Sequence, residues 1–72
     1  MVNINKLKAK IVENGFNVEY VADKVGMDKA TFYRKMANNG ETFLVKEVDA
    51  MARVLKMTGD DINAIFFAQT VA

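Results

Sequence analysis

The chain has 72 residues, of which 51% are hydrophobic and 26% are charged, and its formal net charge is +1. This composition excludes a disordered acidic tail, and the length predicts a single domain. The sequence contains no cysteine and no histidine, which excludes disulfides, thiolate or histidine metal sites, and histidine acid–base catalysis. We therefore expect a binding module rather than an enzyme, with no catalytic residue, no metal and no cofactor.

The opening segment, MVNINKLKAKIV, is too polar for a secretory signal peptide, and no apolar run approaches the ~18 residues of a membrane helix. We expect a soluble cytoplasmic protein with no membrane partner and no small-molecule substrate. One domain should span residues 1–72, with its core at about residues 3–67 and a short tail at 68–72.

The first segment shows apolar residues at helical spacing, which predicts a helix over residues 3–14. These residues are Ile4, Leu7, Ile11 and Val12. Asn14 and Gly15 follow as a left-handed stop signal.

Two short helices are predicted next. Asn17 is a favourable N-cap for a helix that ends near residue 25, before Gly26. Asp28 caps a further helix over residues 29–37, so the connection between the two helices is only two or three residues long. The turn cluster Asn38-Asn39-Gly40 ends this helix.

Two further helices are predicted after a loop that runs to about Leu44. Val45, Val48 and Leu55 mark the first of them by their spacing. Thr58, with Asp61 three residues later, resembles a capping box at the start of the last one. No strand-like alternation competes, so the sequence predicts an all-α fold of five helices, with strands absent or limited to a short C-terminal tail.

Charge is distributed unevenly along the chain. Residues 1–40 contain seven basic and four acidic residues, a net +3, whereas residues 41–72 contain three basic and five acidic residues, a net −2. A basic half is the electrostatic footprint of a nucleic-acid-binding surface, although solvated surface lysines would give the same count.

The segment NVEYVADKVGMDKATFYRKM resembles the bipartite helix-turn-helix of the lambda and Cro-type phage repressors. The small side chain of Ala22 lets two helices approach, and Gly26 permits a positive φ in the turn. A lysine-rich helix before the motif and two helices after it also match, so the resemblance covers about residues 3–67. It implies a five-helix, lambda-repressor-like DNA-binding domain whose second and third helices form the motif.

Four positions depart from the pattern of the family. Lys35 stands where helix 29–37 usually has an apolar residue, which here comes at Met36, and Val18 replaces a frequent phosphate-binding glutamine. The N-cap near Leu44 is poor. Many relatives pair an arginine with a glutamate at the positions of Ile11 and Met36, so we expect these two side chains to touch as an apolar substitute for the ion pair.

The resemblance implies a set of DNA-contacting residues on helix 29–37. Its first, second and sixth positions, which face the bases in the family, match Lys29, Ala30 and Arg34. Arg34 suits a bidentate contact to guanine, Lys29 can reach guanine or phosphate, and Ala30 can pack on a thymine methyl. Tyr33 would either donate a hydrogen bond from its hydroxyl to phosphate or pack against the protein. Thr31 would either contact phosphate or make no contact with DNA.

Contacts to the DNA backbone are expected outside this helix as well. We predict Lys10 as the phosphate contact of the first helix, with Lys6 and Lys8 as solvated lysines. Asn39 and Lys46 border the DNA backbone in relatives. Lys35 would face the backbone or be merely solvated.

The resemblance implies a sequence-specific transcriptional regulator, a phage or prophage Cro-like repressor that binds double-stranded operator DNA as a homodimer. Apolar residues late in the chain would form the dimer contact: Phe67, Val71 and either Val54 or Met57. At this length we expect no self-cleaving domain of the kind found in full-length lambda-type repressors. The alternative function is a protein-interaction module on the same scaffold, such as an antirepressor or an antitoxin subunit.

Overall fold

The computed structural model describes residues 2–67, and within this range it contains five α-helices and no strand. The helices are α1 (Ile4–Glu13), α2 (Val18–Val25), α3 (Lys29–Ala37), α4 (Val45–Val54) and α5 (Gly59–Phe66). The predicted all-α fold of five helices is confirmed for this range, and the expected tail at 68–72 lies outside the described residues. None of these helices has the length and apolar character needed to cross a bilayer.

Side-chain caps explain where the helices begin. The side-chain oxygens of Asn3, Asn17 and Asp28 accept backbone N–H groups in the first turns of α1, α2 and α3. At α5, Thr58 accepts the Asp61 N–H and Asp61 accepts the Thr58 N–H, so the predicted capping box is present.

Helix α4 begins differently because Leu44, its N-cap residue, has no side-chain acceptor. The Glu47 carboxylate accepts the Leu44 N–H at 2.8 Å and also the Lys35 ammonium at 2.9 Å. The same carboxylate thus provides a hydrogen-bond acceptor for the N–H at the start of α4 and links α4 to the last turn of α3. The poor N-cap that the sequence indicates is compensated by this acid.

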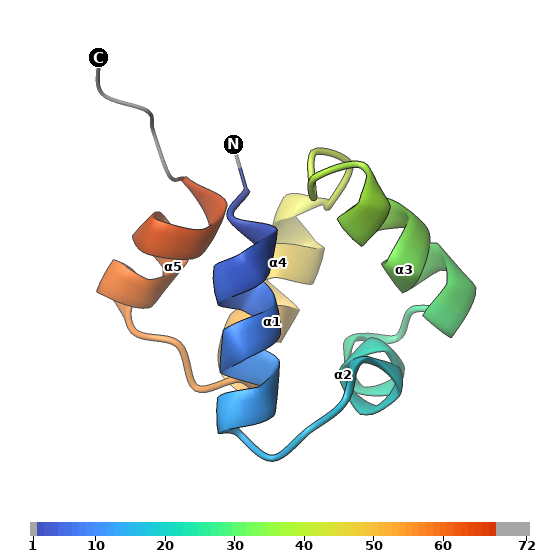
Figure 1. Ribbon diagram of the computed structural model, residues 1–72, viewed down its shortest axis with the longest axis horizontal. Coiled ribbons are helices and arrows are strands. Elements are labelled where there is room, and N and C mark those ends of the chain that lie inside the picture. Colours follow the sequence, from blue (N-terminus) through green and yellow to red (C-terminus); the bar gives the residue numbers. More distant parts are fainter. Residues whose placement is uncertain (1, 68–72) are drawn as a thin grey trace.

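All five helices, and Leu55 directly after α4, contribute to one apolar core. Figure 1 shows α1 beside α5 and in front of α4, with α2 and α3 on the opposite side of the molecule from α5. The core residues are Leu7, Ile11, Val21, Ala22, Phe32, Met36, Met51, Leu55, Ile65 and Phe66. No polar or charged residue is buried within residues 2–67, so burial of apolar surface stabilises the fold.

The connection between α2 and α3 is three residues long. Gly26 adopts a left-handed conformation at φ +83°, which favours glycine, and the Met27 N–H donates to the Ala22 carbonyl at 2.8 Å. Figure 1 shows α2 nearly end-on while α3 runs across the view, so the chain changes direction sharply here. Buried Ala22 and Phe32 hold the two helices to the same core.

The carboxylates of Asp61 and Glu47 should make the stability of the fold depend on pH. The Thr58 N–H and then the Lys10 ammonium lower the pKa of Asp61 below its ordinary 3.8. Partial burial raises the pKa of Glu47, but the Leu44 N–H and Lys35 together outweigh it, and the pKa falls below its ordinary 4.5.

Because both pKa values are lower in the folded state, the stabilisation is present above the ordinary values and is lost as the pH falls through the lowered ones. We therefore expect the urea midpoint to fall progressively between about pH 5 and pH 3. The double variant Glu47→Gln, Asp61→Asn should start less stable and show a flatter dependence over the same range. An equally steep dependence in this variant would contradict the assignment.

Candidate nucleic-acid interface

Helix α3 has one buried and one exposed face. Phe32 and Met36 point into the core, whereas Ala30, Tyr33 and Arg34 are exposed. The latter three share a face because residues three and four apart lie together on a helix. This face therefore consists of a small residue, a half-exposed aromatic ring (Tyr33 is 53% exposed) and one arginine.

Arg34 carries the only formal charge among the three residues of this face. It forms no ion pair with any described residue. An exposed, unpaired guanidinium keeps all its donors available for a planar acceptor such as a guanine edge or a phosphate.

Lys29 begins α3 and lies across from α2. Its ammonium is 3.6 Å from the carboxylate of Glu19, and both side chains are exposed. An ion pair of this kind contributes about 0–1 kcal/mol in water, so an anionic ligand can displace Glu19 at small cost. Lys29 therefore remains accessible to an anionic ligand.

The remaining predicted contacts outside α1 are placed as follows. Thr31 is half-buried on α3, whereas Asn39 is exposed in the turn after it and adopts φ +60°. Lys46 is exposed in the first turn of α4. Lys35 is engaged with Glu47 at 2.9 Å and is mostly buried, which makes it a structural residue rather than a solvated or backbone-facing one.

The structure places Lys10 differently from the prediction. Its ammonium lies 3.2 Å from Asp61 and 3.7 Å from Glu13, and its side chain is only 18% exposed. Lys10 also lines the cleft between α1 and α5, away from α3. A cation that is already paired on that side is poorly placed for phosphate, so we leave Lys10 out of the interface.

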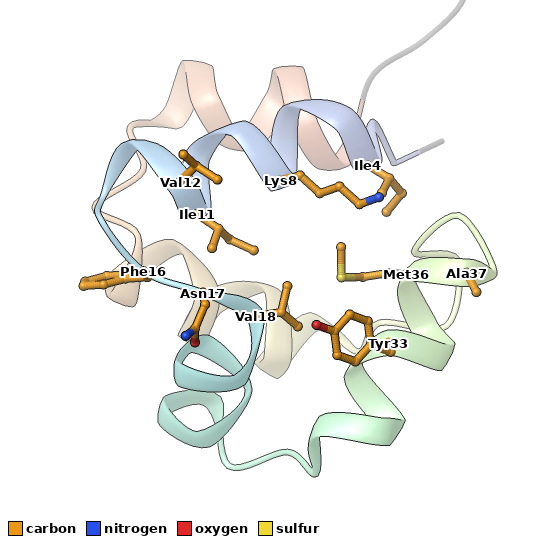
Figure 2. A pocket seen from close by; sticks show the side chains of 10 residues that line it. All are labelled: Ile4, Lys8, Ile11, Val12, Phe16, Asn17, Val18, Tyr33, Met36 and Ala37. Carbon is orange, nitrogen blue, oxygen red and sulfur yellow. The ribbon is translucent and has the colours of Figure 1, made fainter.

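Lys8, which the sequence predicts to be a solvated lysine, lies on a different side of α1 from Lys10 (Figure 2). It is exposed and forms no ion pair with a described residue. Figure 2 shows its side chain on the side of α1 that faces α3, running toward Ile4. Lys8 therefore places an exposed ammonium on the side of α1 that faces α3 (Figure 2), whereas Lys10, the lysine predicted from the sequence, faces α5.

An apolar groove separates α1 from α3, with a volume of about 540 Å³. Ile11 and Met36 both line it and both belong to the buried core, as expected for an apolar pair. Figure 2 shows the Met36 side chain pointing toward α1. Direct contact between the two side chains stays a prediction.

A second apolar surface surrounds the start of α4 and the end of α5. Val45 is 86% exposed and Phe67 is 62% exposed, and both line a smaller pocket of about 290 Å³. Leu44 is exposed beside them. Of the residues expected at a dimer contact, Val54 and Met57 are half-buried, and Val71 lies outside the described residues.

No protein-family model, curated protein or solved structure matches this chain. Among residues 2–67, no three acidic, cysteine or histidine side chains come together in a group that could hold a metal ion. The candidate interface thus rests on the geometry of this chain's own residues.

Proposed function

We propose that this protein is a sequence-specific DNA-binding transcriptional regulator, in which α2, the Gly26 turn and α3 act as a helix-turn-helix. The observation that carries the proposal is the outward face of α3, where small Ala30 stands beside an exposed Arg34 that no described acid engages. A helix that enters the major groove needs such a face, with little bulk and a donor that reaches base edges.

Charge on the neighbouring elements supports the same function. Lys29 at the start of α3 and Lys8 on α1 are both exposed, and Figure 2 shows Lys8 on the side of α1 that faces α3. Phosphate contacts of this kind position a protein on the duplex without reading its sequence. In this proposal Arg34 reads a base, whereas Lys8 contacts phosphate and Lys29 contacts either guanine or phosphate.

A protein-interaction module is the alternative. A helix that binds a protein groove presents several large apolar anchors, but Tyr33 is the only large hydrophobic residue exposed on α3. Three other exposed large hydrophobic residues, Leu44, Val45 and Phe67, lie instead around the start of α4 and the end of α5, where a second copy of this chain can cover them. DNA binding by a dimer therefore accounts for both surfaces.

Selection of bound sites from random double-stranded DNA, followed by footprinting, tests the proposed function. We expect a palindromic site whose half-sites lie about one helical turn, ~34 Å, apart. Recovery of no enriched sequence, with binding no tighter than to bulk DNA, would overturn the proposal and favour the protein-interaction module.

Dimerisation can be tested separately, because the apolar surface around Val45 and Phe67 is distinct from α3. Val45→Glu should weaken self-association and reduce cooperative binding to the palindrome, since a buried unpaired charge opposes the interface. Sedimentation of the free protein and of its DNA complex measures both effects. Arg53→Gln, which lowers the net charge by the same one unit at an exposed side chain further along α4, is the matched control. A wild-type protein that binds one half-site strictly as a monomer contradicts the dimer.

A further inference from the structure

The groove between α1 and α3 has the size and surface of a small-ligand site. Its volume of about 540 Å³ falls within the ~300–1,000 Å³ typical of such sites. Buried Ile11 and Met36 contribute core side chains to its lining, and half-buried Val18 lines it from the first turn of α2. These positions come from three helices that the core holds together, so the groove is preformed.

Few polar groups enter this apolar surface, and they favour an anion. Lys8 carries the only formal charge among the lining residues, and no acid lines the groove. Figure 2 shows the Tyr33 hydroxyl pointing into the groove toward Val18. The side-chain oxygen of Asn17 is already used, because it accepts the Tyr20 N–H at 2.8 Å. A ligand here would meet an apolar surface, one ammonium group and one free hydroxyl.

We propose that this groove binds an amphipathic carboxylate, a monoanion with an apolar body of medium chain length. The body would lie against Ile11, Val18 and Met36, where it is removed from water. The carboxylate would meet the Lys8 ammonium, which has no acidic partner among the described residues. The two parts of the ligand match the two parts of the site.

Binding in this groove would also alter DNA binding, an effect that rests on the proposed function. Lys8 serves phosphate in the DNA complex and the carboxylate in the ligand complex, and Tyr33 lies both in the groove and on the exposed face of α3. The two ligands therefore compete, and by linkage each lowers the affinity of the protein for the other. The chain would be a regulator that releases its operator when the carboxylate is present.

Sodium octanoate is the probe, titrated into the isotope-labelled full chain while backbone amide resonances are followed by NMR. Saturable shifts should cluster at residues of the groove, such as Ile4, Val12, Val18 and Ala37. Sodium acetate lacks the apolar body and octylammonium has the opposite charge, so acetate should give no saturable shift and octylammonium should bind more weakly. Equal binding of octanoate and octylammonium, or shifts centred on Val45 and Phe67, would overturn the proposal.

Two lysine variants isolate the charge. Lys8→Gln should weaken octanoate binding about threefold, as expected for one partly exposed ion pair. Lys6→Gln should leave it unchanged, because Lys6 is also an exposed lysine of α1 but lines the cleft toward α5 instead. If both variants bind octanoate like the wild type, the ammonium plays no part and the assignment is wrong.

Measurements with the selected DNA site distinguish the proposed groove ligand from the proposed DNA-binding function, on which the competition between the two ligands rests. Octanoate should raise the apparent Kd of the operator complex in the wild type and have a smaller effect in Lys8→Gln. Octanoate binding in a chain that selects no DNA site would support the groove and overturn the DNA-binding function. Octanoate binding that leaves operator affinity unchanged would overturn the competition.

Discussion

Replacing Met36 by alanine should lower the free energy of unfolding by about 2–5 kcal/mol, as for other large-to-small changes in a core. Met36 is only 6% exposed and belongs to the core cluster that includes Ile11 and Phe32. Its removal would deprive α3 of one of its two buried anchors. Urea unfolding at neutral pH measures the effect, with an unchanged slope as the sign that the transition remains two-state.

Met27→Ala is the matched control because Met27 is only partly buried, in the turn before α3. Its cost should be clearly smaller than that of Met36→Ala. A loss near zero for Met36→Ala would contradict the buried position of this side chain.

A double-mutant cycle tests whether Ile11 and Met36 touch across the groove. Ile11→Val and Met36→Ala should show a coupling energy of about 0.5 kcal/mol or more if the side chains are in contact. Additive losses would mean that the groove keeps the two side chains apart. The prediction that Ile11 and Met36 form an apolar contact in place of an ion pair would then be wrong.

Local chemistry made the helix boundaries predictable. Asn17, Asp28 and Thr58 each accept a backbone N–H at the start of a helix, and this needs only residues within one turn. Gly26 and Gly40 mark turns for the same local reason, since both have positive φ. Such features lie in a few consecutive residues, so a single sequence reveals them.

The pairing of charges was less predictable because it depends on contacts between distant segments. Lys10 meets Asp61 of α5, and Lys35 meets Glu47 of α4. Helical geometry places Lys8 and Lys10 about 200° apart on α1, so they had to face different neighbours. The sequence does not reveal which face α5 covers, so it could not show that the Lys10 ammonium pairs with Asp61.

The part of the apolar surface at the start of α4 was not predicted, for a related reason, although Phe67 of the same surface was expected to be exposed. Val45 matches the apolar spacing that marks its helix, yet it is 86% exposed. Val48, three residues later, is packed against the core instead. Periodicity locates a stripe of apolar residues but not its edge, and Val45 lies beyond that edge.

Replacing Arg34 by alanine should weaken binding to the selected DNA site by about 1–3 kcal/mol and relax the preference at one base pair in each half-site. The reason is its position, since Arg34 is exposed on α3 opposite Phe32 and has no acidic partner among the described residues. Titrations against the selected site and a scrambled site, at several salt concentrations, measure affinity and specificity together.

Two variants give the contrast that this measurement needs. Arg53→Ala removes the other arginine of the chain, which pairs with Asp49 at 2.9 Å on α4, and should leave both affinities unchanged. Lys8→Ala should weaken binding to both sites alike and lower the salt slope by ~1, as for a lost phosphate contact.

If Arg34→Ala instead loses affinity equally on both sites, Arg34 contacts phosphate, and base reading moves to Lys29 and Tyr33. If neither Arg34→Ala nor Lys8→Ala changes DNA binding, α3 is not a recognition helix and the protein-interaction function takes precedence.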